Sequence, residues 1–280
     1  METKRKVTQE EYDEVLESHR VFLLVQGGGL RMEFENCDLV GIIMRRGADL
    51  TGAKFINCDL QGNRFQDVTA VNAEFTGSNL SDAQFYSCDI SRATLVGVNL
   101  DGAEIVNGKY TGAQFRSSSM TGTSFLKVGL TKARFGGVKG QGAVFRECDA
   151  SYATYTDSTW VDGFMTECKF KKATFEGATF QAVDFFGSDF HDATINADSE
   201  FLRCGMWDVQ GNNGVIRSYQ LPRWTVVVCR DQIQIGCQSH PLKAWMGFDN
   251  EEISQMSDYA LHWWGIYKSL VMQLAKLPER

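Results

Sequence analysis

Apolar side chains recur every five residues along more than half of the chain, from Ala48 to about Asn196. Of the 30 positions whose numbers end in 0 or 5 between Leu50 and Ile195, 27 carry Phe, Leu, Ile, Met, Tyr or Trp. A small residue stands two positions before each of them, Asn63 excepted, and the other positions are mostly polar or Gly. Such a period matches neither the 3.6 residues of an α-helix nor the 2 of a β-strand. It predicts a stacked repeat. The three apolar positions without a large side chain are Ala70, Gly140 and Ala150.

A second period of 20 residues indicates that four five-residue sides make one turn. One column is Ala throughout, which indicates a place with room only for a methyl group: Ala53, Ala73, Ala93, Ala113, Ala133, Ala153, Ala173 and Ala193. Two columns of large apolar residues begin at Phe55 and Phe65. The pattern predicts a square coil whose turns pair through parallel ladders about 4.8 Å apart. The repeat then makes about 7–8 turns and a rod roughly 35 Å long.

In many units the small residue is followed by Asp or Asn and then by a large apolar residue. Clear examples are Ala48-Asp49-Leu50, Cys58-Asp59-Leu60, Ser78-Asn79-Leu80, Cys88-Asp89-Ile90, Val98-Asn99-Leu100 and Ser188-Asp189-Phe190. This pattern resembles that of the pentapeptide-repeat family, and the resemblance covers over half of the chain. It implies an all-β solenoid, a right-handed quadrilateral parallel β-helix. It implies no single function, because one fold serves many functions.

Residues 1–29 are predicted to be an N-terminal helical cap. Thr8 is a suitable N-cap, and acidic residues in the following turn favour the helix dipole. The glycines at 27–29 end the helix, and no Lys-Ser/Thr pair follows them as a phosphate-binding loop requires. The β-helix is expected over 30–197, with an irregular first turn in which one residue bulges near Arg45–Gly47. The cap is needed because an exposed coil end is an unpaired strand edge.

Residues 198–280 break the repeat and are predicted to form a small α+β domain. Segments 224–229 and 233–235 are typical of a β-hairpin. Pro241 can open a short helix that runs through Trp245. Asp249 or Asn250 can cap a long helix that extends to Leu274. The broad apolar face of that helix must be buried, on the last turn of the coil or on a partner.

Several segments outside the coil resemble those of pentapeptide-repeat proteins from bacteriophages and prophages. They are the stretch 14–19 before the glycine run, the stretch 235–240, Trp245 with Phe248, and the stretch 260–268. Phe22 stands where that group usually has Trp. The resemblance implies a phage or bacterial origin and supplies no mechanism.

Charge is divided unevenly along the coil. Residues 48–107 hold 8 acidic and 3 basic side chains, and residues 108–197 hold 9 acidic and 10 basic ones. With this balance of charge we do not expect a basic groove for nucleic acid. Some proteins of the resembling family imitate DNA and occupy a type II topoisomerase, as inhibitors or protectors. Duplex DNA carries one charge per about 1.7 Å, so a mimic of this length needs on the order of twenty negative charges. The net negative charge of the coil is well short of that number, and a DNA mimic is kept as an alternative function.

The cysteines of the coil occupy the small interior positions, as at Cys58, Cys88, Cys148 and Cys168. There they are expected to be packed free thiols, which fits a reducing cytoplasm. The first nine residues are not those of a signal peptide, and no apolar run reaches the roughly 20 residues of a membrane span. We therefore expect a cytoplasmic protein with no membrane contact.

The candidate chemistry of the C-terminal region is sparse. Cys237 and His240 have a spacing that zinc can use, but structural zinc sites need four ligands. The same pair, or Ser239 with His240, has no orienting acid for nucleophilic catalysis. We expect no cofactor, no catalytic residue and no enzymatic activity.

Outward positions on one side of the coil are apolar and predict a contact surface: Tyr86, Val106, Leu126, Val144, Phe164 and Phe186. The alternative is that such residues merely suit β-strands. A second expected interface is the C-terminal helix, with Trp263, Trp264 and Tyr267, residue types common at binding hot spots. Adjacent helical residues point about 100° apart. We expect one tryptophan to seal the last turn around Phe180, Phe185 and Phe190, and the other to face a second copy.

The predicted function is that of a non-enzymatic interaction or structural protein, a rigid rod that binds a protein partner or itself. A phage inhibitor of a host defence protein is a further alternative within that class.

Overall fold

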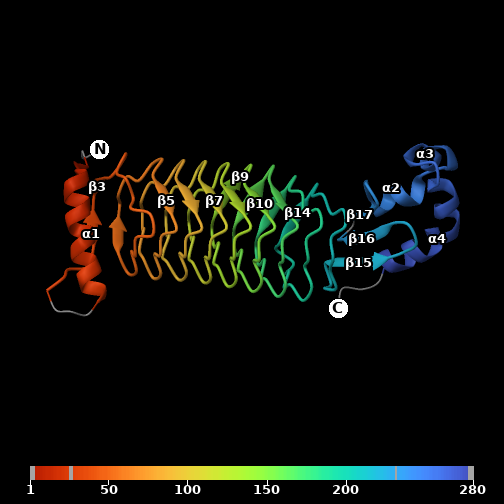
Figure 1. Cartoon of the computed structure of the whole chain (residues 1–280). Helices are drawn as coiled ribbons and strands as arrows, with labels where there is room; N and C mark the ends of the chain where they lie inside the picture. The colour runs from red at the N-terminus through yellow and green to blue at the C-terminus, as the bar shows by residue number, and fades with distance from the viewer. Residues whose placement is uncertain (1–3, 25–27, 231, 277–280) are drawn as a thin grey trace.

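The computed structural model describes residues 4–24, 28–230 and 232–276. Its centre is a parallel β-solenoid of about 8 turns, with a helix at one end and a small α+β domain at the other (Figure 1). Successive turns pair with an offset of 20 residues, so that Phe65 lies opposite Phe85 and Phe85 lies opposite Ile105. The stacked square coil expected from the repeat is confirmed.

Parallel strands gather on the sides of the coil. A six-stranded sheet has the spatial order β12 (Phe164–Thr166), β10 (Val144–Arg146), β8 (Ser124–Leu126), β7 (Glu104–Val106), β6 (Gln84–Tyr86) and β5 (Arg64–Gln66). A four-stranded sheet has the order β14 (Glu200–Leu202), β13 (Thr179–Gln181), β11 (Thr159–Val161) and β9 (Lys139–Gln141). Near the N-terminus β2 (Glu33–Glu35) pairs with β4 (Lys54–Ile56). Single bridges with the same offset connect the turns elsewhere, as between Asp49 and Thr69.

Interior side chains stack in columns along the rod. The ring centroids of Phe65 and Phe85 are 4.5 Å apart, and so are those of Phe125 and Phe145. The alanine column points inward as expected, since Ala113 is fully buried. Burial of these columns in every turn supplies the main stabilising free energy of the coil.

The coil cysteines are free thiols, as expected from their positions. The Cys58 thiol donates to the carbonyl oxygen of Phe34 at 3.3 Å, and Cys88 donates to Phe65 O at 3.4 Å. These contacts join one turn to the turn below.

Gly140 lacks a large side chain because the neighbouring turn fills its space. A Cβ at this position would lie 2.5 Å from Cζ3 of the buried Trp160 indole. The apparent break in the apolar column is therefore a compensation between two adjacent turns.

Aspartates of the repeat hold the corners. The Asp59 carboxylate accepts from the backbone N–H of Gln61 at 3.2 Å, and Asp89 accepts from Ser91 N at 3.1 Å. This bonding of Asp to nearby backbone was expected from the pattern. The corner residues that follow the strands often have positive φ, as at Asn57 (51°), a conformation that favours Gly, Asn and Asp.

The N-terminal helix α1 (Gln9–Leu23) covers the first turn of the coil (Figure 1). The Thr8 hydroxyl caps it by accepting from Glu11 N, as the sequence predicts. The Tyr12 ring stacks on Phe34 of the first turn, with centroids 6.4 Å apart. A short strand before it, β1 (Arg5–Lys6), pairs with β3 (Cys37–Asp38) and extends the ladder. Gly27 of the glycine run lies outside the described residues.

The first turn contains the expected extra residue. Phe34 pairs with Phe55 at an offset of 21 residues, whereas Asp49 pairs with Thr69 at 20. The bulge therefore lies between them, consistent with its expected place near Arg45–Gly47.

The ladder continues past residue 197, where the sequence pattern ended. Phe180 pairs with Phe201 of β14, and a further bridge joins Asp189 to Gln210. Both offsets are 21, so one inserted residue shifts the five-residue phase and hides the last turn from a periodicity search. The coil is longer than the expected 30–197.

The C-terminal domain is a four-stranded antiparallel sheet covered by helices on the side away from the coil (Figure 1). Its strands are β15 (Ile216–Gln220), β16 (Thr225–Cys229), β17 (Gln232–Ile235) and β18 (Gln238–Pro241). The hairpin expected over 224–235 is confirmed as β16 and β17. The sheet seals the last turn of the coil, because Val227 and Cys229 join the core of the coil while Val226 and Val228 join the core under the helices.

The prediction of one long helix from Asn250 to Leu274 is wrong, because the structure divides this segment into two helices. Helix α3 (Asn250–Met256) ends at Ser257, which is extended (φ −173°), and α4 (Ala260–Ala275) starts after a three-residue break. Ser and Asp compete with helix formation by bonding to the local backbone, and both stand at the break. The Asp249 cap is confirmed, and the short helix after Pro241 is α2 (Leu242–Gly247).

Within the described ranges, no helix has both the length and the apolar character that a membrane span requires.

Candidate functional site

The predicted contact surface lies on the outer face of the six-stranded sheet. Tyr86, Val106 and Leu126 occupy the same register position on the neighbouring strands β6, β7 and β8. Each is half-buried, with its outward face open to solvent. The Tyr86 hydroxyl donates to the Glu104 carboxylate at 2.6 Å, which fixes the ring against the sheet.

Further along the rod the apolar side chains change column. Arg146 and Thr166 continue the column of Leu126, while Val144 and Phe164 occupy the column beside it. Phe164 is 50% exposed, a large value for an aromatic ring on a regular strand. The structure thus brings Tyr86, Val106, Leu126, Val144 and Phe164 together on one sheet, in a bent line and not in a single column, and Phe186 lies in a turn beyond its last strand.

An exposed tryptophan extends this line. Phe186 packs against Trp207 with ring centroids 5.1 Å apart, and Trp207 is 52% exposed. Sequence reasoning missed Trp207 because the extra residue near position 197 breaks the phase; the signal was its spacing of 21 from Phe186. We call the outward apolar residues of this side the apolar stripe: Tyr86, Val106, Leu126, Val144, Phe164, Phe186 and Trp207.

The second predicted interface is wrong for both tryptophans. Trp263 and Trp264 are each only 5% exposed and pack beneath their own domain's sheet, in a cluster with Trp224 and Trp245. The indole N–H of Trp263 donates to Pro222 O at 2.6 Å. Neither ring seals the coil, because the C-terminal sheet lies between α4 and the last turn. Tyr267 is half-buried against Trp263 at a centroid distance of 4.9 Å.

Cys237 and His240 do not assemble a metal centre in the described part of the chain, where no three His, Cys, Asp or Glu side chains are grouped to hold an ion. The His240 ring instead packs edge-on against Trp245 and Phe248, at centroid distances of 5.3 and 4.9 Å. Cys237 is exposed in the turn between β17 and β18.

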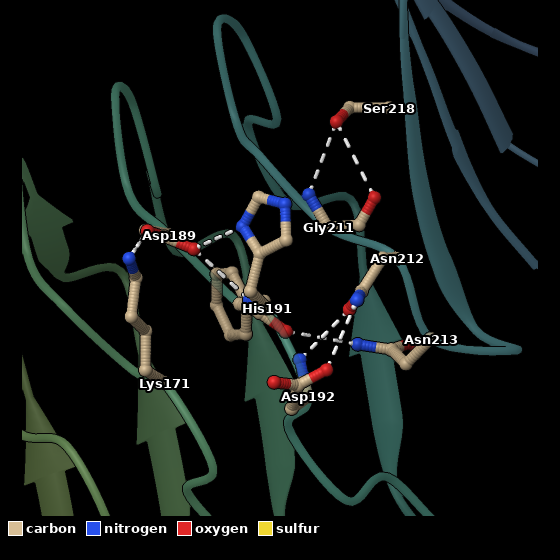
Figure 2. Close-up of polar contacts among 9 residues, drawn as sticks. Lys171, Asp189, His191, Asp192, Gly211, Asn212, Asn213 and Ser218 are labelled. Atoms are coloured by element: carbon tan, nitrogen blue, oxygen red, sulfur yellow. Dashed lines mark hydrogen bonds and ion pairs between the residues drawn. The ribbon is translucent and has the colours of Figure 1, made fainter.

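A polar network ties the end of the coil to the C-terminal domain (Figure 2). Asp189 accepts from the Nδ1 side of the His191 ring at 2.6 Å and pairs with Lys171 Nζ at 3.1 Å. Burial alone would raise the pKa of the Asp189 carboxyl, but hydrogen bonds from the His191 backbone and ring and from Lys171 outweigh it and hold this pKa below its usual value.

Across the junction, asparagines and a serine complete the network (Figure 2). The Asn212 side chain donates to the Asp192 carboxylate at 3.0 Å, and Asn213 donates to the backbone oxygen of Phe190 at 3.2 Å. Ser218 bonds to both backbone groups of Gly211. The described hydrogen bond of the His191 ring goes to Asp189, so this Asp–His pair holds a turn.

A scan of family models matches one described as pentapeptide repeats, over residues 33–62, 46–82, 78–109 and 165–196. Among curated proteins no match was found.

Three solved structures of similar repeats illustrate the low sequence identity. HetL, a pentapeptide repeat protein involved in heterocyst differentiation regulation in the cyanobacterium Nostoc, is 17% identical; the match covers 68% of this chain and 92% of that chain at a TM-score of 0.23. QnrB1, a plasmid-mediated fluoroquinolone resistance protein, is 16% identical over 59% of this chain and 94% of that chain, at a TM-score of 0.31. A pentapeptide repeat protein from the thylakoid lumen of Arabidopsis thaliana is 23% identical over 41% of this chain and 77% of that chain, at a TM-score of 0.27.

Proposed function

Because a model of pentapeptide repeats matches much of the coil, and the coil exposes aromatic side chains along one side, we propose that the chain is a non-enzymatic interaction protein. In this proposal the solenoid is a rigid rod, and the apolar stripe binds a protein partner. The partner lies lengthwise along the six-stranded sheet.

The observation that carries the proposal is the exposure of Phe164 and Trp207, at 50% and 52%, on a backbone held by ladder hydrogen bonds. Aromatic residues are over-represented among the residues that dominate binding free energy. A surface already held rigid loses little conformational entropy on association. From Tyr86 to Trp207 the stripe crosses six turn spacings, roughly 29 Å, which suits the apolar centre of an interface.

The partner is a protein and not a nucleic acid, because the stripe is apolar and the coil has no net positive charge. We place it in a bacterial cytoplasm, on the strength of the buried free thiols of the coil and the resemblance to phage proteins. An inhibitor of a host defence protein is one member of this class.

We do not favour a DNA mimic acting on a topoisomerase. Basic side chains gather around two adjoining hollows on another side of the coil: Arg92, Arg116, Lys132 and Arg134. A surface that imitates DNA presents dense negative charge instead. Inhibition of DNA supercoiling at sub-micromolar protein would reverse this judgement.

For self-association we propose an outer face of α4 in place of the buried tryptophans. Ile266 and Leu270, four residues apart and so on the same side of the helix, are 57 and 38% exposed there. Two copies related by a two-fold axis can bury this face against itself. Light scattering on the full chain and on Ile266→Asp tests the assignment. A dimer that the substitution dissociates supports it, and a monomer at micromolar concentration contradicts it.

Photo-crosslinking tests the apolar stripe. The photoreactive residue p-benzoylphenylalanine is placed at Phe164 or, as a matched control, at Tyr152, a corner residue outside the six-stranded sheet that is also 50% exposed. Each protein is irradiated in a bacterial lysate, and the products are identified by mass spectrometry. We expect one dominant partner from position 164 that position 152 does not capture.

Two substitutions then check the same contact. Phe164→Asp should abolish capture of that partner and Tyr152→Asp should not, in pull-downs with the purified proteins. Capture should persist at high salt, because apolar contacts are not screened. The same products from both positions, or none from position 164, would contradict the proposal.

A further inference from the structure

A cavity of about 140 Å³ lies inside the C-terminal domain, between the helix-facing side of its sheet and the helices. Aromatic rings from two helices and one loop form its walls: Trp224 of the loop before β16, Trp245 of α2, and Trp263 and Trp264 of α4. The rest of the apolar lining is Ile235, Ile253, Met256 and Ala260. None of the described lining residues carries a charge.

The hydrogen bonds of the buried indoles are incomplete. Trp245 Nε1 donates to Ile233 O at 2.8 Å, and Trp263 Nε1 donates to Pro222 O at 2.6 Å. Trp264 Nε1 is buried as well, yet it has no acceptor among the described residues. Buried indole N–H groups usually find a partner, so an unpaired one beside a cavity indicates a missing acceptor.

The Trp264 ring is held in place from a second direction. The Lys268 ammonium lies over the ring, 5.5 Å from its centroid, and the ring packs at 5.2 Å from Trp245. A cation over the face of an indole leaves its N–H free. The donor is therefore fixed in direction before any ligand arrives.

Access to the cavity is through a polar edge. Cys237 is exposed, and Gln238 and Ser257 are half-buried, and all three contribute to the lining. A small molecule can therefore reach the tryptophans without unfolding the domain.

We propose that this cavity binds a small, uncharged aromatic molecule with one hydrogen-bond acceptor, which receives the N–H of Trp264. The size follows from the volume, because an apolar cavity of about 150 Å³ accommodates benzene. The lack of charge follows from the lining, because a buried charge without a partner is strongly disfavoured. Water fills the inner part of the cavity poorly, since each molecule needs several polar partners and the polar side chains of the lining stand at its edge. This site is separate from the apolar stripe and does not depend on its function.

Two probes of the same shape test the proposal on the full chain. Benzonitrile carries an acceptor nitrogen, and phenylacetylene replaces it by C–H. Ligand-observed NMR titrations give a dissociation constant for each. We expect saturable binding of both, with benzonitrile tighter by about fivefold, the ratio that one neutral hydrogen bond supports.

Two substitutions locate the site. Trp264→Phe removes the donor and should bring the two dissociation constants together. Ala260→Leu fills the cavity and should abolish binding of both probes. Circular dichroism and thermal melting check that each variant is folded.

A measurement on the unsubstituted protein does not depend on variant folding. Benzonitrile should slow the alkylation of Cys237, the exposed cysteine at the edge of the cavity, by iodoacetamide. The absence of saturable binding, equal affinity for the two probes, or unchanged binding by a folded Ala260→Leu protein would each overturn the proposal.

Discussion

Replacing Gly140 and Trp160 by leucine, separately and together, tests whether the coil interior is specified by volume shared between turns. Their column carries Leu60, Leu80 and Leu100 in the earlier turns, besides Met120 and Phe180, so leucine is the residue that the column uses most often. The glycine backbone does not have positive φ, and only space opposes a side chain there.

The expected magnitudes follow from the contacts. Gly140→Leu should lower the free energy of unfolding by about 3 kcal/mol, because its first carbon alone would lie 2.5 Å from Trp160 Cζ3. Trp160→Leu should cost about 2 kcal/mol, less than the 3–5 of a truncation to Ala, because leucine retains part of the volume. In the double variant each change relieves the other. We expect the double variant to lose about 2–3 kcal/mol of unfolding free energy, which is about 2–3 kcal/mol less than the sum of the two single losses.

The assay is guanidinium denaturation followed by far-UV circular dichroism, since removing Trp160 alters the fluorescence directly. The control pairs Gly140→Leu with Phe65→Leu, whose site is nearly four turns away, roughly 18 Å along the axis. These two changes should add within experimental error. If the Gly140/Trp160 pair is also additive, the compensation inferred from the structure is refuted.

Three further predictions concern single residues. Ala113→Leu should destabilise by about 3 kcal/mol, because the fully buried column has no room for added methylenes; a melting temperature within a degree or two of the parent would contradict this. Tyr155→Phe should leave the melting temperature unchanged or raise it, since the buried hydroxyl has no partner among the described residues and its desolvation opposes folding by about 1 kcal/mol or more. Burial would raise the pKa of the Asp189 carboxyl, but hydrogen bonds from His191 and Lys171 outweigh burial and hold this pKa below its usual value. The ionised carboxylate therefore stabilises the fold fully above the unfolded pKa of about 3.9. This stabilisation is lost as the pH falls through the lower pKa of the folded state. Asp189→Asn should cost about 1 kcal/mol at pH 7 and reduce the loss of stability below about pH 4 in denaturant titrations; an unchanged pH profile would count against the network.

The coil could be predicted from the sequence because each of its turns places residues of the same kind at the same positions. A position that must face inward recurs every five residues, so a single pattern reports the fold many times over. The pattern was uninformative where one residue is inserted, near position 197, and the last turn and Trp207 were missed there. Gly140 looked like a defect because its explanation, Trp160, belongs to a different turn. A search for a five-residue period detects neither the inserted residue near position 197 nor the exchange of volume between Gly140 and Trp160.

The C-terminal tryptophans show a different limit. Apolar spacing on a helix predicts that a face is buried, but it does not say against what. Trp263 and Trp264 were expected to contact the coil and a second copy, whereas the sheet supplies both the cap of the coil and the floor beneath the helix. The alternation of Val226 and Val228 with Val227 and Cys229 carried that information, since a strand that is apolar on both faces must be covered on both faces.

The need for this two-sided sheet follows from the coil itself. Each turn contacts only the turns beside it, so the solenoid has no natural end, and its last turn exposes both apolar rings and unpaired backbone. At the N-terminus the amphipathic helix α1 meets that requirement with one face. At the C-terminus a sheet does so, and its outer face then requires helices of its own. Those helices meet the sheet through large, irregular indole rings, which pack less uniformly than the phenylalanine columns of the coil. The cavity beside Trp264 arises where the repeat ends and packing is no longer set by a regular pattern, and this is where a ligand site distinct from the rod can form.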